Sequence, residues 1–456
     1  MPREHRVRDL ALFTDLYELT MAAVYHARQM NAPATFELFV RALPPSLGYL
    51  VVSGIESALE RLERFSFDAD GLEYLDSLEM FSDSFLSLLE NLRFSGEVWA
   101  IPEGEVVFAT EPLLRVTAPL VEAQLVETIL LNAVGYETSV ATRAARIATA
   151  CEGRAFVDFA ARRSDGIDAA LRGARAAQVG GASGTSLVVA GQKYGLDLSG
   201  TMAHSYVMSF DDERDAFATF ARAFPGRAVL LLDTYDTEEA ARRLVDMAPD
   251  LRAENALPVG VRLDSGALGE LSRSVRLLLD EAGLTDVRIF ASGNLDEHRI
   301  AELVAQHAPI DAFGIGTHLV TSTEAPALDT AYKLVDDTGG AKMKLSAGKA
   351  TLPGRKQVHR VTLDGRSAYD ILALDDEPVR DANPLLEQVM AGGTRTRAPE
   401  PLTAASSRCR EALSKLPGDV RALHPGPERY DVRVSAGLAA LRDQLRRAHV
   451  STTREE

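Results

Sequence analysis

The middle of this chain repeats one structural pattern although the residues themselves do not repeat. Each unit has a short apolar run, then a polar residue or a glycine, then a stretch whose apolar residues are spaced as in an amphipathic helix. Strands that alternate with helices in this way form a parallel sheet, which is either open and doubly wound or closed as a barrel. Seven apolar runs follow the pattern, at residues 155–157, 178–181, 196–199, 228–232, 259–263, 287–291 and 312–315.

Polar residues and glycines follow most of these predicted strands. Both kinds of parallel sheet bind their ligands at the carboxyl ends of the strands. We therefore expect an active site along that edge of the sheet. The residues placed there include Asp158, Thr201, Asp233, Asp264, Gly293 and Thr317.

The two ends of the chain show a different pattern. Residues 9–91 are mainly helical around a strand-like run at 35–40, and residues 98–117 alternate as short strands. More short strands and a final helix at about 435–448 follow residue 333. We expect an α/β protein with an N-terminal α+β domain at 1–125 and an α/β domain with the active site at 126–334. A C-terminal segment at 335–456 would complete the α+β domain.

Composition limits the partners and the compartment. The 49 basic and 66 acidic residues give a net charge of −17, which argues against nucleic acid or an anionic membrane as the main partner. Cys151 and Cys409 lie in no spacing typical of a zinc site, which fits a reducing compartment. No apolar leader follows the first charged residues, and nowhere do about 18 apolar residues run together. These features predict a cytoplasmic protein outside the membrane.

His204 follows the small residues Gly200-Thr201-Met202-Ala203 at the end of a predicted strand. That position would place an imidazole at the mouth of the sheet, where it could act as a base, an acid or a nucleophile. The alternative is a histidine that only caps or packs locally.

Arg262 and Asp264 are two residues apart on one predicted strand, so both side chains point to the same face. A guanidinium there suits a carboxylate or phosphate, which it can grip with two parallel hydrogen bonds. The alternative is an ion pair between the two side chains within the protein.

Two strand ends bear glycines, at Ser292-Gly293-Asn294 and at Gly314-Ile315-Gly316-Thr317. Backbone N–H groups in such turns can hold a phosphate, and a helix after Gly293 would add its dipole. Because the loops of the last strands are the usual phosphate site of a barrel, their joint occurrence favours a phosphorylated substrate. Glycine turns without a ligand remain the alternative.

Three further residues are ambiguous from pattern alone. Arg162, beside Arg163, could neutralise phosphates, although paired arginines also form solvated faces. Asp233 could bind ribose hydroxyls or a metal-bound water. Tyr17 lies at the start of an amphipathic helix capped by Thr14 or Asp15, where pattern alone favours a core position.

Together these runs resemble nicotinate phosphoribosyltransferase. The resemblance extends from residue 14 to at least residue 358, and it depends on a set of motifs in order rather than on one of them. The set is Thr-Asp-Leu-Tyr at 14–17, Pro-Glu-Gly at 102–104, Ala-Thr-Arg-Ala-Ala-Arg at 141–146, Gly-Thr-Met-Ala-His at 200–204, Val-Arg-Leu-Asp-Ser-Gly at 261–266 and Gly-Ile-Gly-Thr at 314–317.

The resemblance implies an irregular, incomplete α/β barrel of about seven strands and a homodimer with shared active sites. It implies an NAD-salvage enzyme of the ligase type, which joins nicotinate to phosphoribosyl pyrophosphate and gives nicotinate mononucleotide and pyrophosphate. ATP hydrolysis to ADP and phosphate drives that reaction. Mg²⁺ would accompany phosphoribosyl pyrophosphate and ATP, with no metal ligands assigned to the chain and no tightly bound organic cofactor.

The resemblance also assigns roles to residues. His204 would be phosphorylated by ATP during turnover. Arg262, Thr201 and Tyr17 would contact nicotinate, with Tyr17 reaching in from the other subunit. Other residues would bind the phosphoribosyl group or take part in the reaction next to it. They are Arg162, Asp233, Asp264, Gly293, Asn294, Gly316 and Thr317.

Three positions bear on specificity or depart from the family pattern. Met202 stands where related nicotinamide enzymes have an aspartate that accepts the amide N–H, so it favours nicotinate. Ala267 replaces a second aspartate and Leu187 replaces an asparagine. The rival readings are a nicotinamide or quinolinate phosphoribosyltransferase on the same fold, and a catalytically silent metabolite-binding homologue.

Overall fold

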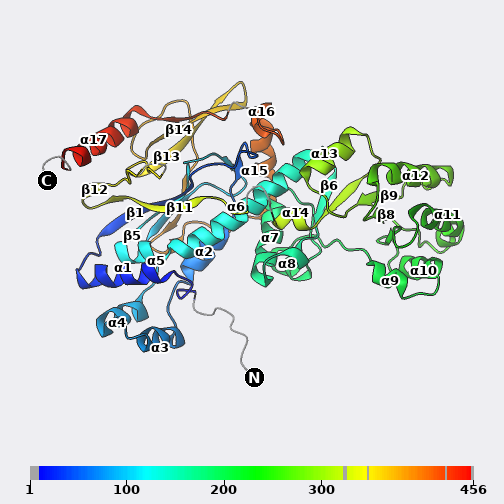
Figure 1. Ribbon diagram of the computed structural model, residues 1–456, viewed down its shortest axis with the longest axis horizontal. Coiled ribbons are helices and arrows are strands. Elements are labelled where there is room, and N and C mark those ends of the chain that lie inside the picture. The colour runs from blue at the N-terminus through cyan, green and yellow to red at the C-terminus, as the bar shows by residue number, and fades with distance from the viewer. Residues whose placement is uncertain (1–9, 322–325, 347–348, 427–428, 453–456) are drawn as a thin grey trace. The chain divides into compact units, whose positions relative to one another are not determined.

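The computed structural model describes residues 10–321, 326–346, 349–426 and 429–452 (Figure 1). The chain forms two compact units, Met1–Thr142 together with Glu324–Glu456, and Arg143–Thr323. We call them the terminal unit and the central unit. None of the helices in the described part of the chain is long and apolar enough to cross a membrane.

The central unit is built on a five-stranded parallel sheet in the order β6-β10-β9-β8-β7. Its helices precede or follow the strands as the repeated pattern predicts, so the α/β class is confirmed. The strands are β6 (Ala155–Asp158), β7 (Val229–Leu231), β8 (Gly260–Leu263), β9 (Arg288–Ala291) and β10 (Ala312–Ile315). The helices are α7 (Ile167–Val179), α8 (Val188–Tyr194), α9 (His204–Met208), α10 (Glu213–Ala223), α11 (Thr237–Ala253), α12 (Leu268–Glu281), α13 (Glu297–Ala305) and α14 (Thr317–Val320), with a 3₁₀ turn η1 at Ala161–Arg163.

Two of the seven predicted strands are not strands. Residues 178–181 hold the end of α7 and the glycines that terminate it, because the alanine-rich run before them continues as helix. Residues 196–199 contribute only an isolated bridge at Leu198, which pairs with Thr185, and Thr185 pairs in turn with Asp158 of β6. These parallel bridges extend the sheet beyond β6 through two single residues.

The terminal unit contains mainly antiparallel sheets, and the largest is assembled from both chain ends. The largest has the order β12-β11-β1-β5-β3-β16-β17, and β1 lies between β5 and β11 in it. Its strands are β1 (Pro33–Val40), β3 (Glu97–Ala100), β5 (Pro112–Pro119), β11 (Thr330–Asp337), β12 (Gly340–Ala341), β16 (Glu387–Ala391) and β17 (Thr394–Arg395). A second sheet has the order β15 (Asn383–Pro384), β13 (Lys356–Leu363), β14 (Arg366–Leu374) and β18 (Val432–Val434), and β2 (Leu50–Val51) pairs with β4 (Val106–Val107).

The helices of this unit lie mainly before β3 and after β17. They are α1 (Leu16–Ala27), α2 (Ile55–Glu63), α3 (Ala69–Ser77), α4 (Asp83–Asn91), α5 (Leu120–Leu125), α15 (Leu402–Lys415), α16 (Gly418–Arg421) and α17 (Ala436–Thr452). One continuous core contains side chains from the first and the last part of the chain, among them Leu38, Leu114, Tyr332 and Leu438. Tyr332 of β11 stacks on Phe36 of β1 with ring centroids 4.9 Å apart.

The unit limits differ from the expected boundaries at 125/126 and 334/335. Helix α6 (Glu127–Ala150) runs without a break across the first limit. The Thr142 hydroxyl accepts a hydrogen bond from Val51 N in the terminal unit, and the Arg146 guanidinium pairs with Glu297 in the central unit at 2.9 Å. The second expected boundary falls inside β11, which belongs to the terminal unit because it pairs with β1 along its length.

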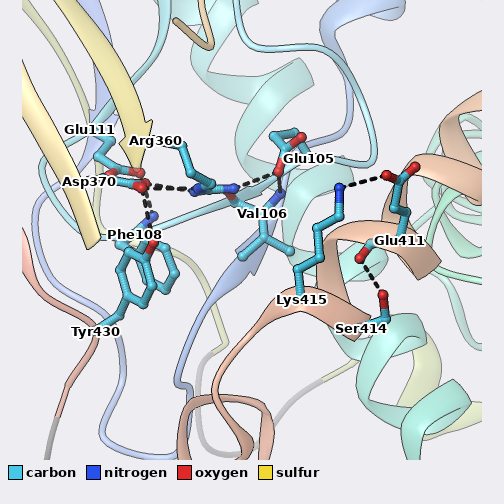
Figure 2. Close-up of polar contacts among 10 residues, drawn as sticks. All are labelled: Glu105, Val106, Phe108, Glu111, Arg360, Asp370, Glu411, Ser414, Lys415 and Tyr430. Atoms are coloured by element: carbon cyan, nitrogen blue, oxygen red, sulfur yellow. Dashed lines mark hydrogen bonds and ion pairs between the residues drawn. The ribbon is translucent and has the colours of Figure 1, made fainter. Parts of the chain in front are cut away.

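A buried network of charges joins the two ends of the chain in the terminal unit (Figure 2). The Arg360 guanidinium donates two hydrogen bonds to Asp370, at 3.0 and 2.7 Å, and one to Glu105 at 2.6 Å. The Tyr430 hydroxyl donates to Asp370 at 3.0 Å. Burial, and then the negative charge of Asp370, hold the pKa of Glu111 well above its usual range.

Candidate active site

A cavity of about 910 Å³ lies along the parallel strands of the central unit, from Val229 and Val259 at their amino ends to Ser292 directly after β9. Polar residues and aromatic residues share its wall, as in many small-molecule sites. Arg262 and Thr201 lie in it together with residues of every strand of the sheet. The lining residues are Val157, Phe159, Leu196 to Thr201, Phe220, Phe224, Arg227, Val229, Val259, Arg262, Phe290 to Ser292, Phe313 and Gly314.

Arg262, near the end of β8, is only partly paired. Its Nη1 donates to Thr201 Oγ1 and, at 3.3 Å, to the carbonyl of Met202, while Nη2 lies 3.7 Å from Asp264 Oδ1. Its buried Nε has no hydrogen-bond partner among the described residues. Burial lowers the pKa of Arg262 and nearby Arg162 lowers it further, although Asp264 and Asp233 oppose them. This guanidinium has unused capacity for an anion, which a closed internal ion pair would lack.

The two aspartates after β7 and β8 are held by hydroxyl and amide donors. Asp233 Oδ2 accepts from the backbone N–H of Asp264, at 3.2 Å, and from the Ser265 hydroxyl. Asp264 Oδ1 accepts from the Ser292 hydroxyl. Asp233 Oδ1 is buried and has no partner among the described residues. These contacts leave one oxygen of Asp233 available for a ligand.

His204 is the first residue of α9, and its ring lies between the ends of two strands. Its Nδ1 is 3.2 Å from Thr234 Oγ1, and its Nε2 is 3.9 Å from Asp264 Oδ2. The side chain is 40% exposed, so the imidazole is not packed away. Thr234 orients the ring through Nδ1, and no hydrogen bond occupies Nε2 among the described residues. An imidazole held in this way can act as a nucleophile or a general base.

The glycine loops close the same edge of the sheet. Gly293 has φ +89°, and a Cβ there would lie 1.7 Å from the carbonyl oxygen of Asp264, so no other residue fits. Next to it, Asn294 Oδ1 lies 3.1 Å from His318 Nε2. Gly316 precedes Thr317, an exposed residue that begins the short helix α14.

The helix predicted after Gly293 is present as α13, which begins four residues later, at Glu297. The Asp296 side chain caps it by accepting from Arg299 N at 2.8 Å. Because a carboxylate already caps this N-terminus, the donors that remain for a phosphate are those of the loops and their side chains.

Two other predicted residues lie apart from this cluster or at its margin. Arg162 is exposed in η1, yet it is close enough to Arg262 to affect its pKa. Tyr17 is on α1 of the terminal unit and is 47% exposed, so the predicted core position is wrong. The structure does not bring Tyr17 together with the strand-end residues within one unit.

Two hydroxyls at the site received no role of their own from the sequence, namely Ser265 and Ser292. Each stands next to a predicted site residue or a glycine at a strand end, so adjacency was the available signal. Serines and threonines at strand ends are too common for that signal to single them out.

The two departures from the family pattern occupy the same kind of position. Leu187 is the N-cap of α8 and Ala267 is the N-cap of α12, and neither helix has a side-chain cap. Asparagine and aspartate are favoured at N-caps. An asparagine at 187 and an aspartate at 267, as is usual in the family, would therefore cap these helices. Their replacement by Leu187 and Ala267 removes a helix cap.

Comparisons with known proteins identify the family. A model of the nicotinate phosphoribosyltransferase N-terminal domain matches residues 12–135, and the nicotinate phosphoribosyltransferase family model matches residues 154–349. A nicotinate phosphoribosyltransferase of Mycobacterium tuberculosis is 46% identical over 440 residues, which cover 96% of this chain and 94% of that protein. One of Bacillus subtilis is 43% identical over 381 residues, covering 82% and 78%.

The fold comparison agrees. The crystal structure of human nicotinic acid phosphoribosyltransferase matches with a TM-score of 0.85 at 29% identity, covering 95% of this chain and 99% of the human one. Both family models, the relatives that align along most of their length and the shared fold lead to one conclusion: this chain belongs to the nicotinate phosphoribosyltransferase family.

Proposed function

We propose that this protein transfers the phosphoribosyl group of phosphoribosyl pyrophosphate to nicotinate, giving nicotinate mononucleotide and pyrophosphate for NAD salvage. The observation that carries the proposal is the partly paired guanidinium of Arg262 in the cavity wall, with Thr201 beside it. An arginine whose burial disfavours its charge gains most from an anionic ligand, and the nicotinate carboxylate supplies that charge. The buried side chain of Met202 offers no carboxylate to an amide ligand.

The phosphoribosyl group occupies the ends of β9 and β10 in this proposal. Backbone donors of the Gly293 and Gly316 loops, Asn294 and the Thr317 hydroxyl hold its 5′-phosphate, and exposed Arg162 neutralises the pyrophosphate. Asp233 hydrogen-bonds the ribose through its free oxygen. Displacing pyrophosphate from C1 of ribose develops positive charge on the sugar, which the carboxylates of Asp233 and Asp264 stabilise.

Mg²⁺ fits this arrangement as a companion of the substrate. It keeps several waters and binds through one or two carboxylates plus substrate phosphates, and when bound it neutralises the departing pyrophosphate. The described residues contain no cluster of three or more acidic, histidine or cysteine side chains for a metal, so substrate phosphates and water would supply most of its ligands, with Asp264 beside it.

ATP enters through His204 in the proposed mechanism. A ring nitrogen attacks the γ-phosphorus, the bond to the β,γ-bridging oxygen breaks, and ADP leaves. Hydrolysis of the phosphohistidine later returns the imidazole and releases phosphate. The contact of Nδ1 with Thr234 and the exposure of the ring support this role, because they orient the imidazole and leave it accessible.

The sheet and the oligomer complete the proposal. Bridges through Thr185 and Leu198 extend the sheet on one side, and the cavity is lined from both of its edges, which supports an incomplete barrel of about seven segments. Tyr17 would reach the base from the second subunit of a homodimer, since its side chain is half-exposed. We place the reaction in the cytoplasm, because its substrates are metabolites of that compartment.

A comparison of bases tests the transfer. Purified protein is given phosphoribosyl pyrophosphate, Mg²⁺ and ATP with nicotinate, nicotinamide or quinolinate in turn, and mononucleotide and pyrophosphate are measured. We expect turnover with nicotinate to exceed that with the other two. Faster turnover of nicotinamide or quinolinate would reassign the substrate, and no turnover with any base would favour a silent binding protein.

Replacement of His204 tests the coupling to ATP. We expect His204→Ala to abolish ATP hydrolysis coupled to product formation, to leave slow uncoupled transfer, and to lose an acid-labile phosphate label that the unaltered protein acquires from γ-labelled ATP. His307→Asn, at an exposed histidine after α13 whose positive φ asparagine tolerates, is the matched control. Unchanged coupling in His204→Ala would contradict the phosphohistidine.

A further inference from the structure

Glu18 is a fully buried carboxyl in the terminal unit, and no cation pairs with it among the described residues. Its neighbours are oxygen atoms and one amide. Oε2 lies 2.5 Å from Thr14 Oγ1, and Oε1 lies 2.5 Å from Thr128 Oγ1 and 3.2 Å from Thr128 N. These contacts join the first turn of α1 to the first turn of α6.

The hydrogen atoms of this cluster can be counted. Thr128 has one hydroxyl hydrogen, yet its Oγ1 lies within reach of two carboxyls, Glu18 at 2.5 Å and Asp15 at 3.0 Å. With both carboxyls ionised, one of these contacts would place two acceptors together. A proton on one of the two carboxyls resolves this, and burial assigns it to Glu18, which is fully buried whereas Asp15 is exposed. Glu18 then donates to Thr128 and Thr128 donates to Asp15. Geometry and burial together therefore favour a neutral Glu18 in the closed contact.

The surrounding charges act in the same direction. Burial raises the pKa of Glu18 to about 7, although hydrogen bonds from Thr128 and Thr14 lower it, and the charges of Glu127 and Asp15 raise it further. Tyr17 and Tyr332 are the other titratable groups that interact with it. Lys333 of β11 is engaged by Glu127, at 3.2 Å.

Tyr17 directly precedes Glu18 and lies in the same first turn of α1. Its side chain lies close enough to the carboxylate of Glu127 for that charge to raise its pKa, and Lys333 and Gln124 hold Glu127 in place. Its backbone carbonyl accepts from the Thr20 hydroxyl at 3.0 Å. Burial and the charges of Glu127 and Glu18 keep the pKa of Tyr17 raised, so the phenol remains a neutral donor.

We propose that Glu18 and Thr128 are positioning residues for Tyr17, and that their contact holds the first turn of α1 only while Glu18 is protonated. The inference rests on the proposed function, in which Tyr17 contacts nicotinate. A carboxyl whose pKa is raised by folding stabilises its surroundings below that pKa and loses the effect as pH rises through it. The first turn of α1 therefore becomes less ordered above pH 7, and the site binds nicotinate more weakly.

The test combines a structural and a kinetic readout on the full-length protein with phosphoribosyl pyrophosphate, ATP and Mg²⁺. Hydrogen exchange of the α1 amides, corrected for the intrinsic effect of pH, is measured between pH 6.5 and 8.5 without substrates. We expect protection to fall with rising pH in the unaltered protein and to stay level in Glu18→Gln, which mimics the protonated carboxyl. Over the same range the KM for nicotinate should rise about tenfold, because the competent fraction falls, while kcat changes less. Glu18→Gln should remove most of that rise.

Two further variants keep the result interpretable. Glu122→Gln neutralises a half-buried carboxyl of this unit, which bonds Ser95 and not α1, and it should keep the wild-type rise in KM. Thr128→Ser retains the hydroxyl and should also keep it. Level exchange in the unaltered protein, or the same KM profile in Glu18→Gln, would overturn the inference. Absence of nicotinate turnover in the unaltered protein would instead overturn the proposed function, while the exchange data would still judge the contact.

Discussion

Each unit of this protein contains an arginine among carboxylates, and the two arginines differ in how fully they are paired. Every nitrogen of the Arg360 guanidinium donates a hydrogen bond, to Asp370, Glu105 or the carbonyl of Val106. Arg262 leaves Nε without a partner among the described residues and reaches Asp264 only at 3.7 Å.

The pKa values of the two guanidinium groups shift in opposite directions. Burial lowers both, but hydrogen bonds to Asp370 more than offset it at Arg360, whose pKa is raised. At Arg262 the carboxylates do not offset burial, and the pKa is lowered. In the terminal unit, carboxylates of the protein thus neutralise the buried arginine. In the central unit they do not do so fully, and an anionic substrate can supply the remaining negative charge.

The largest effect should come from removing the satisfied arginine. Arg360→Met leaves Asp370 and Glu105 buried without their cation, and we expect the free energy of unfolding of the terminal unit to fall by about 3–5 kcal/mol. Urea unfolding followed by the fluorescence of Trp99, the single tryptophan, which lies in β3 of this unit, measures the loss.

The control for this change appears in the same view of the molecule (Figure 2). Lys415 and Glu411 form an ion pair of 2.6 Å on the exposed side of α15. We expect Lys415→Ala to leave the unfolding curve unchanged, because exposed pairs are solvated and add little. Equal effects of the two variants would mean that burial does not distinguish the pairs.

A smaller effect on free energy, but a large one on activity, should follow replacement of the unsatisfied arginine. Arg262→Lys keeps the charge and loses the planar fork, so we expect kcat/KM for nicotinate to fall about 100-fold, or about 2.7 kcal/mol. Stability should change by less than about 1 kcal/mol, because few contacts are lost.

Arg273→Lys provides the comparison. Arg273 bonds two backbone carbonyls on the helical side of the central unit, so its replacement should leave kcat/KM unchanged. If Arg262→Lys lowered the free energy of unfolding as much as Arg360→Met, the proposed difference in pairing between the two arginines would be contradicted.

The smallest effect concerns pH. Because the pKa of Glu111 is raised by burial and by Asp370, the stability it contributes is present below that pKa and is lost as pH rises through it. We expect the unfolding free energy of the unaltered protein to decline, as pH rises above the usual range of a carboxyl, by up to about 1 kcal/mol per pH unit more than that of Glu111→Gln. Parallel curves for the two proteins would show that Glu111 does not titrate in this range.

The sequence predicted the central unit better than the terminal one, for a physical reason. A parallel strand followed by a helix is a local pattern, so five strands and the residues near their ends could be placed, including Arg262 and Asp264. Residues 178–181 were misjudged because a short apolar run does not distinguish a buried strand from the end of a buried helix.

The polar networks of the terminal unit could not be predicted, because their members are far apart in the sequence. Glu18 meets Thr128 across 110 residues, and Arg360 meets Glu105 across 255. Such partners come together only through the tertiary fold, and no spacing in the sequence marks them. Tyr17 was assigned to the core by pattern, and only family resemblance gave it a role.

The central unit is an insertion in the terminal unit, and this sets the order in which the protein can be completed during synthesis. Strand β1 and Glu105 leave the ribosome early, but their partners β11 and Arg360 lie beyond residue 323. At about 5–20 residues per second, translating residues 143–323 takes about 10–40 s. The inserted unit can fold from contiguous chain during that interval, while the first 142 residues wait with an unpaired edge and need protection from aggregation.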